Sequence, residues 1–182
     1  MSDEPVLHPG HRSIRLKGFD YSTPSVYFVT ICTHERRCVL GRVDRNLIEQ
    51  TSIGRIAHES WIAIPSHFPQ VNIYAFVVMP NHLHGIIEIA SLAGAQRAAP
   101  LPEKIALKPH VGPGSLGAVV RSFKAAVTKR ANRELGWRGE VWQRNYFERV
   151  LRDGKEFSDA SRYIAENLLM WELDQENPNR RR

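Results

Sequence analysis

The sequence is poor in cysteine and has no long apolar run. Among its 182 residues there are two cysteines, Cys32 and Cys38, which lie six positions apart and form no C-x-x-C pattern. This spacing predicts neither a disulfide framework nor a zinc knuckle. No segment approaches the roughly 20 apolar residues that cross a bilayer, and the N-terminus lacks the apolar core of a signal peptide. We therefore expect a soluble cytoplasmic protein with no membrane partner.

Acidic residues are fewer than basic ones. The chain has 19 Asp and Glu against 25 Lys and Arg, which gives a formal net charge of +6. A positive surface attracts polyanions, because phosphate binding releases counterions, so the charge favours a nucleic-acid partner without identifying one. The length suits one domain with a hydrophobic core. We expect a basic arm over residues 1–20, a single domain over residues 21–171 and a polar, solvated tail over residues 172–182.

Four segments have the composition of β-strands. Residues 25–33 are rich in aromatic and β-branched side chains, which predicts a strand buried on both faces. Residues 71–79 and 82–89 flank the turn signal Pro80-Asn81, so they are expected to pair as an antiparallel hairpin. Residues 147–151 are a possible fourth strand.

Three segments have helical periodicity. The first runs from Thr51 to Pro65, the second follows the capping residue Ser115 over residues 116–135, and the third spans residues 157–171. Between them, residues 90–114 are rich in proline and glycine and predict a flexible loop. The order of the elements matches an α+β, ferredoxin-like βαββαβ sandwich: an antiparallel sheet with helices on one face, plus a C-terminal helix.

Two histidines flank Leu83 in "MPNHLHGIIEI". Side chains two apart on a strand share a face, so His82 and His84 can reach one ion; alternatively they are half-buried, hydrogen-bonded rings. Two ligands do not make a tight metal site, so others must come from elsewhere. On the last predicted helix, Tyr163 and Asn167 lie one turn apart and could supply a nucleophile and a ligand. Taken alone, Tyr163 is better explained as an amphipathic residue at the edge of the core.

A set of segments that follow one another in the chain carries a family resemblance. They are "HRSIRLKGFDYS", "YFVTICT", "FVVMPNHLHGII", "GSLGAVVRSFKAAVTKR", "VWQRNYFERVLR" and "RYIAENLLMW". Over about residues 12–171 the chain resembles the REP-associated tyrosine transposases of the single-tyrosine HUH superfamily. The resemblance implies a metal-dependent enzyme that cleaves and rejoins single-stranded DNA bearing palindromic hairpins, through a 5′-phosphotyrosine.

The resemblance also implies roles for single residues. Tyr163 would be the nucleophile, and His82 and His84 would hold Mg²⁺ or Mn²⁺ with Asn167 as a possible third ligand. Tyr146 is the alternative nucleophile. The chain departs from its relatives at Leu168, where they commonly carry proline, and at Arg149, where they often carry histidine; both departures lie outside the proposed site. Whether the protein is a monomer or a homodimer stays open.

Basic and aromatic residues are candidates for contacts with DNA. Those predicted to bind phosphates are Arg12, Arg15, Lys17, Arg121, Lys124, Lys129 and Arg130, and those that could stack on bases are Tyr21, Trp137 and Trp142. Each cation can equally be a solvated surface charge, and the two tryptophans can equally be core. Two other functions remain: a non-catalytic single-stranded nucleic-acid-binding module of ferredoxin-like fold, and a metal-dependent phosphodiesterase that uses water.

Overall fold

The structure is a computed structural model that describes residues 24–45, 47–90, 114–174 and 177–178. Four predicted DNA contacts (Arg12, Arg15, Lys17 and Tyr21) and most of the predicted loop 90–114 lie outside these ranges. Among the described residues, no helix combines the length and the apolar composition that a membrane span requires.

The main sheet has four strands, and every neighbouring pair in it is antiparallel. The strands are β1 (Ser25–Cys32), β4 (Val71–Val78), β5 (His82–Ile89) and β6 (Phe147–Leu151), in the spatial order β4-β5-β1-β6. Strand β1 pairs with β5 along its whole length and with β6 on its other side. This is the strand order of the ferredoxin-like βαββαβ fold, so the predicted fold class is confirmed.

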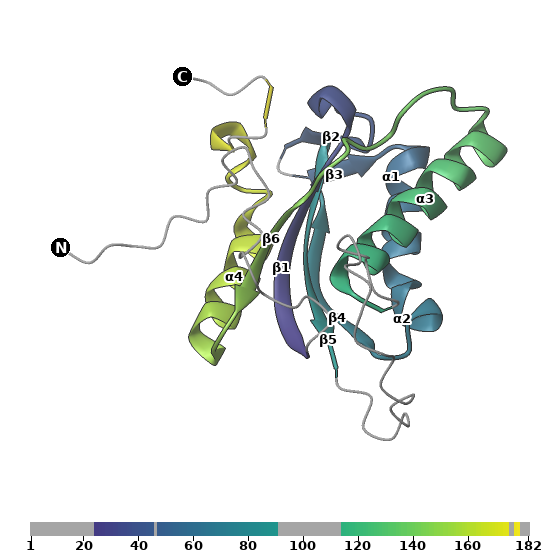
Figure 1. The fold of residues 1–182 in the computed structure, drawn as a ribbon. Coiled ribbons are helices and arrows are strands. Elements are labelled where there is room, and N and C mark those ends of the chain that lie inside the picture. Colours follow the sequence, from purple (N-terminus) through teal and green to yellow (C-terminus); the bar gives the residue numbers. More distant parts are fainter. Residues whose placement is uncertain (1–23, 46, 91–113, 175–176, 179–182) are drawn as a thin grey trace, which may run out of the picture.

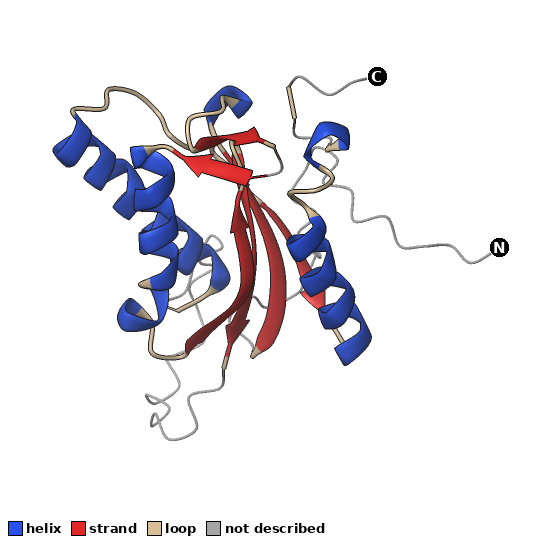
Figure 2. Cartoon of the chain, turned by 180° about the vertical axis from the view of Figure 1, so that it is seen from behind, coloured by secondary structure: helices blue, strands red, loops and turns tan. Residues whose placement is uncertain are grey.

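The helices lie on both sides of this sheet. They are α1 (Ser52–Ile62), the short α2 (Ile64–His67), α3 (Leu116–Leu135) and α4 (Gly154–Glu166). Helices α1 and α3 pack together on one face, and α4 covers the other (Figures 1 and 2). Side-chain oxygens of Thr51 and Ser115 accept hydrogen bonds from the first turns of α1 and α3, as expected of N-caps.

Each face of the sheet has its own core. The larger core lies between the sheet and helices α1 and α3, and it includes Trp61 and Phe123 in edge-to-face contact. The smaller core lies under α4 and includes Phe28 and Ile86. Because side chains alternate along β5, Leu83 points into the larger core while the residues on either side of it point toward α4. This alternation decides on which face the two histidines lie.

The structure differs from the prediction in one added element and in the end of the last helix. A small hairpin, β2 (Gly41–Asp44) and β3 (Leu47–Gln50), was not predicted. The last helix begins after the capping carboxylate of Asp153 and ends at Glu166, rather than continuing to Trp171, which lies in a separate 3₁₀ turn. The apolar spacing that predicted a longer helix continues through a turn and this 3₁₀ segment, in which Leu168 and Trp171 are half-buried.

Candidate active site

His82 and His84 lie side by side on the α4 face of β5. Their ring centroids are 4.4 Å apart, and both side chains are buried. The sequence predicted that they share a face, and the alternation of β5 produces this arrangement.

Neighbouring polar groups orient both rings. The Asn81 amide donates from Nδ2 to the carbonyl of Arg36 (3.1 Å), so its Oδ1, 2.9 Å from His82 Nδ1, is the acceptor. His82 therefore carries its proton on Nδ1, and its Nε2 presents a lone pair. The hydroxyl of Thr30 lies 2.8 Å from Nδ1 of His84 in the same manner. Partners of this kind fix the ring orientation of metal-binding histidines.

Burial keeps both rings neutral. Desolvation lowers the pKa of His82 to about 4, against the smaller raising influences of Asp174 and then Asn167, while the charge of Arg36 lowers it further. Desolvation, with a smaller contribution from His82, lowers the pKa of His84 well below its usual range. Neutral imidazole is the form that binds metal ions, so no proton has to leave either ring at neutral pH.

A carboxylate completes the cluster. Asp174 Oδ2 lies 3.9 Å from His82 Nε2, and ligand atoms of His82, His84 and Asp174 all lie within 4.8 Å of one another. The predicted third ligand, Asn167, is buried beside them and donates from Nδ2 to Asp174 Oδ2 at 3.2 Å. Among the described residues, His82 Nε2 and Asn167 Oδ1 are buried without a hydrogen-bond partner. Such atoms are costly unless something binds them, so this donor set fits a divalent metal.

Asp174 was missed by the sequence analysis, which placed it in a solvated tail. That prediction is wrong at this position, because only 6% of the Asp174 side chain is exposed. No motif or period marks the residue in the sequence. The only signal is that it is an acidic residue a few positions after the predicted helix, close enough for the chain to turn back over the site.

Tyr163 reaches the histidines from α4. Its hydroxyl lies 3.5 Å from His84 Nε2, at the outer limit of a hydrogen bond, and its ring meets the imidazole edge-on at 5.2 Å. The two residues belong to the same chain. The alternative nucleophile, Tyr146, packs instead against the core under α1 and α3, with Lys124 Nζ 5.8 Å from its ring centroid. Of the two tyrosines considered, the structure brings Tyr163 to the histidines.

One departure from the family pattern contacts the first turn of α4, and the other follows its end, directly after Asn167. Arg149, on β6, donates to the Glu156 carboxylate at 2.9 Å and so ties the first turn of α4 to the sheet. Leu168 follows the end of the helix at Asn167, and the helix ends there although no proline is present.

The predicted DNA-binding residues of α3 lie on the opposite side of the sheet from the histidines (Figures 1 and 2). Lys124 is half-buried, and its ammonium donates to the carbonyls of Gln143 and Asn145, both at 2.9 Å. Burial lowers its pKa to about 8. Arg130 pairs with two carboxylates, Glu59 and Glu134. Arg121 and Lys129 are exposed, and both line a groove of about 870 Å³ together with Lys124, Arg133 and Arg144.

The two proposed stacking residues that the structure describes differ in exposure. Trp142 is part of the larger core and only 7% exposed, and Trp137 packs against that core. The core interpretation therefore holds for Trp142, whereas Trp137 is half-buried and its stacking role stays a prediction.

Comparison with known proteins places the chain. No protein-family model matches it. It is 41% identical over 167 residues to an "uncharacterized protein" of Haemophilus influenzae, and the alignment covers 90% of this chain and 91% of that protein. The solved structure of a REP-associated tyrosine transposase bound to a REP hairpin matches with a TM-score of 0.50 and 20% identity, over 80% of this chain and 67% of that chain. The chain therefore belongs to the family of the Haemophilus influenzae protein, and it has the fold of the REP-associated tyrosine transposase predicted from its sequence.

Proposed function

We propose that the protein is a tyrosine transposase that cleaves and rejoins hairpin-bearing single-stranded DNA through a 5′-phosphotyrosine. One observation carries the proposal: the hydroxyl of Tyr163 lies 3.5 Å from His84 Nε2, beside a second buried histidine whose Nε2 has no hydrogen-bond partner among the described residues. The shared fold and the REP hairpin bound by the structural relative support it.

The buried donors prepare the site for an anionic substrate. A phosphodiester repels nucleophiles, so its cleavage depends on charge neutralisation and positioning. His82, His84 and Asp174 would hold a divalent ion such as Mg²⁺ or Mn²⁺, with Asn167 Oδ1 as a further candidate ligand. When bound, the ion supplies Lewis-acid polarisation of a nonbridging phosphate oxygen.

Tyr163 performs the bond exchange. Its phenolic oxygen attacks phosphorus, which forms the tyrosyl ester to the 5′ phosphate and breaks the bond to the 3′ oxygen of the preceding nucleotide. The phenol loses its proton, and the departing 3′ oxygen gains one and leaves as a hydroxyl. An unperturbed tyrosine has a pKa of about 10, so this proton must leave during the attack. The ester conserves the energy of the broken bond, so a 3′-hydroxyl can reverse the reaction and rejoin strands without ATP.

The exposed cations of α3 are proposed to bind a part of the DNA away from the cleaved bond. Arg121 and Lys129 lie on the α1–α3 side of the sheet, whereas Tyr163 lies on the α4 side. A folded hairpin is long enough for its stem to contact one side while its unpaired flank enters the other. Contacts from Arg12, Arg15 and Lys17 remain a prediction from the sequence, as do those of Lys124 and Arg130, which also have partners inside the protein.

The direct test is a covalent adduct assay. Labelled single-stranded hairpin DNA is incubated with the protein and Mn²⁺ or Mg²⁺ and separated on a denaturing gel. We expect an adduct that EDTA prevents, that Tyr163→Phe lacks and that the matched control Tyr146→Phe retains. Cleavage without an adduct in Tyr163→Phe would indicate a phosphodiesterase that uses water. Binding without cleavage by the unmodified protein would indicate the non-catalytic binding module.

A mixing experiment tests whether one chain supplies the whole site. Because Tyr163 and His84 meet within one chain, a mixture of Tyr163→Phe and His82→Ala proteins should form no adduct. Recovery of activity in the mixture would show that two subunits share each site, which only a dimer allows.

A further inference from the structure

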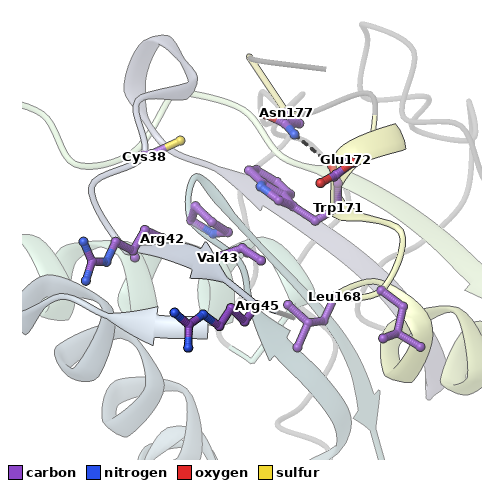
Figure 3. Close-up of a pocket in the computed structure, with 11 residues that line it drawn as sticks. Cys38, Arg42, Val43, Arg45, Leu168, Trp171, Glu172 and Asn177 are labelled. Atoms are coloured by element: carbon purple, nitrogen blue, oxygen red, sulfur yellow. Dashed lines mark hydrogen bonds between the residues drawn. The ribbon is translucent and has the colours of Figure 1, made fainter. Parts of the chain in front are cut away.

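A groove opens beside the histidine pair, between the β2–β3 hairpin and the segment that follows α4 (Figure 3). Its volume is about 450 Å³, within the range of about 300–1,000 Å³ that is typical of small-ligand sites. Apolar surface from Val43, Pro80, Leu168 and Trp171 lines it, together with the charged side chains Arg42, Arg45 and Glu172. Neither the β2–β3 hairpin of the protein nor the groove takes part in the cleavage step described above.

The groove is contiguous with the candidate active site. The Trp171 ring centroid lies 6.1 Å from that of His82, with the two rings inclined by 35°. Pro80, which also lines the groove, stands two residues before His82. A strand whose phosphate lies at the histidines would therefore bring a neighbouring nucleotide to this groove.

The two arginines of the groove differ in whether their charge is balanced by a carboxylate. The Arg42 guanidinium donates to the Glu49 carboxylate on β3 at 2.6 Å, so its charge is already partly balanced. Arg45, at the end of β2, is exposed and forms no hydrogen bond or ion pair with the other described residues. In Figure 3 both arginines lie across the groove from Trp171, with Val43 between them.

This combination suits an unpaired nucleotide. An indole face stacks on any base, while a guanidinium binds a phosphate. Glu172 lies next to Trp171 in the groove, where its carboxylate can accept hydrogen bonds from an exocyclic amine of adenine, cytosine or guanine, but would repel a phosphate. The polarity therefore places the base on the Trp171 side and the phosphate on the Arg45 side. A base within a duplex has both faces covered by its neighbours and would not be available to stack.

We propose that this groove binds one unpaired nucleotide adjacent to the cleaved bond, with its base against Trp171 and its phosphate at Arg45. The inference rests on the proposed function, because it takes single-stranded DNA as the substrate. It adds a contact that would position the DNA strand. The β2–β3 hairpin of the protein and Trp171 provide this contact, and the sequence analysis assigned neither of them to DNA binding.

The test is an abasic scan in the Tyr163→Phe protein, which binds DNA without cleaving it. Each flanking nucleotide of a fluorescent hairpin is replaced in turn by an abasic analogue, and Kd is measured by anisotropy. One position should weaken binding by roughly 5- to 150-fold, the range for loss of one stacked base. Adding Trp171→Leu should weaken binding of intact DNA similarly and abolish the abasic penalty at that position alone. A penalty that persists at every position overturns the proposal, as does the absence of any sensitive position.

Arg45 gives a second variant that leaves the core untouched. Arg45→Ala should lower affinity and reduce the salt dependence of log Kd by about one phosphate contact, whereas Arg138→Ala, which removes an exposed arginine in the loop after α3, should change both less. Equal effects of the two variants would contradict the role of Arg45, and a groove that instead binds a protein partner would show no DNA effect from either groove variant. The abasic scan measures binding and needs no cleavage, whereas the adduct assay measures cleavage. Either experiment can therefore fail while the other succeeds, so the two proposals are tested separately.

Discussion

Lowering the pH from 7 to 5 should destabilise the metal-free protein through His82. Its pKa is about 4 in the folded protein, against 6.5 for an unperturbed ring. Between these values the unfolded chain binds more protons than the folded one, so the free energy of unfolding falls as the pH drops below 6.5. At pH 5 the difference spans about 1.5 pKa units, which corresponds to about 2 kcal/mol. His84, whose pKa is also lowered by burial, adds to the loss in the same direction.

Urea denaturation in EDTA at pH 7 and pH 5 measures this loss. Carboxylates also titrate in this range, so the informative quantity is the difference between the unmodified protein and His82→Gln. The variant should lose about 2 kcal/mol less than the unmodified protein over the same pH interval. A matched substitution of the exposed His67 on α2 controls for removal of a ring elsewhere. Equal pH dependence in the unmodified protein and His82→Gln would refute the view that His82 is buried as a neutral ring.

Three further outcomes follow from single contacts. Gly85→Ala would place a Cβ in overlap with Trp61 Cζ2, so urea denaturation should show that the free energy of unfolding falls by about 1–3 kcal/mol; unchanged stability would mean that the Trp61 ring has room to move. Lys124→Met leaves main-chain carbonyls without their donor and should lower the free energy of unfolding by about 1–3 kcal/mol. Arg121→Ala should weaken DNA binding at unchanged stability. Lost stability in Arg121→Ala together with a pure loss of DNA binding in Lys124→Met would contradict both assignments. Asn81→Leu removes the acceptor that orients His82 and should weaken Mn²⁺ binding, measured by calorimetry, by about 10- to 100-fold; an unchanged affinity would remove Asn81 from the site.

The parts of the fold that were predicted from the sequence have local signals. The bounds of β5 and α3 agree with prediction because each element is delimited by its own neighbours: Pro80-Asn81 precedes β5, while Ser115 caps α3 and Gly136 ends it in a left-handed conformation. Strand β1 was recognisable because both of its faces are buried, so its apolar run is continuous. In these cases residues within or next to the element decide both its hydrophobic pattern and its backbone conformation.

The parts that were missed depend on contacts between distant residues. Asp174 is buried because the chain after α4 turns back to the histidines, and only the folded structure shows that contact. The β2–β3 hairpin has four-residue strands with few buried side chains, so it offers too little periodicity to predict. The internal contacts of the α3 cations could not be predicted either: Lys124 was expected to bind DNA, and its ammonium also donates to the main-chain carbonyls of Gln143 and Asn145.

The most direct measurement is to locate the nucleotide on the protein by mass spectrometry. After reaction with hairpin DNA and Mn²⁺, the adduct is trimmed with nuclease and digested with trypsin. Cleavage after Arg162 separates the peptide of residues 163–180, which holds Tyr163, from the peptide of residues 145–149, which holds Tyr146. We predict a nucleotide mass on the first peptide, at Tyr163. A nucleotide on the second peptide, or DNA cleavage with neither peptide modified, would contradict the account.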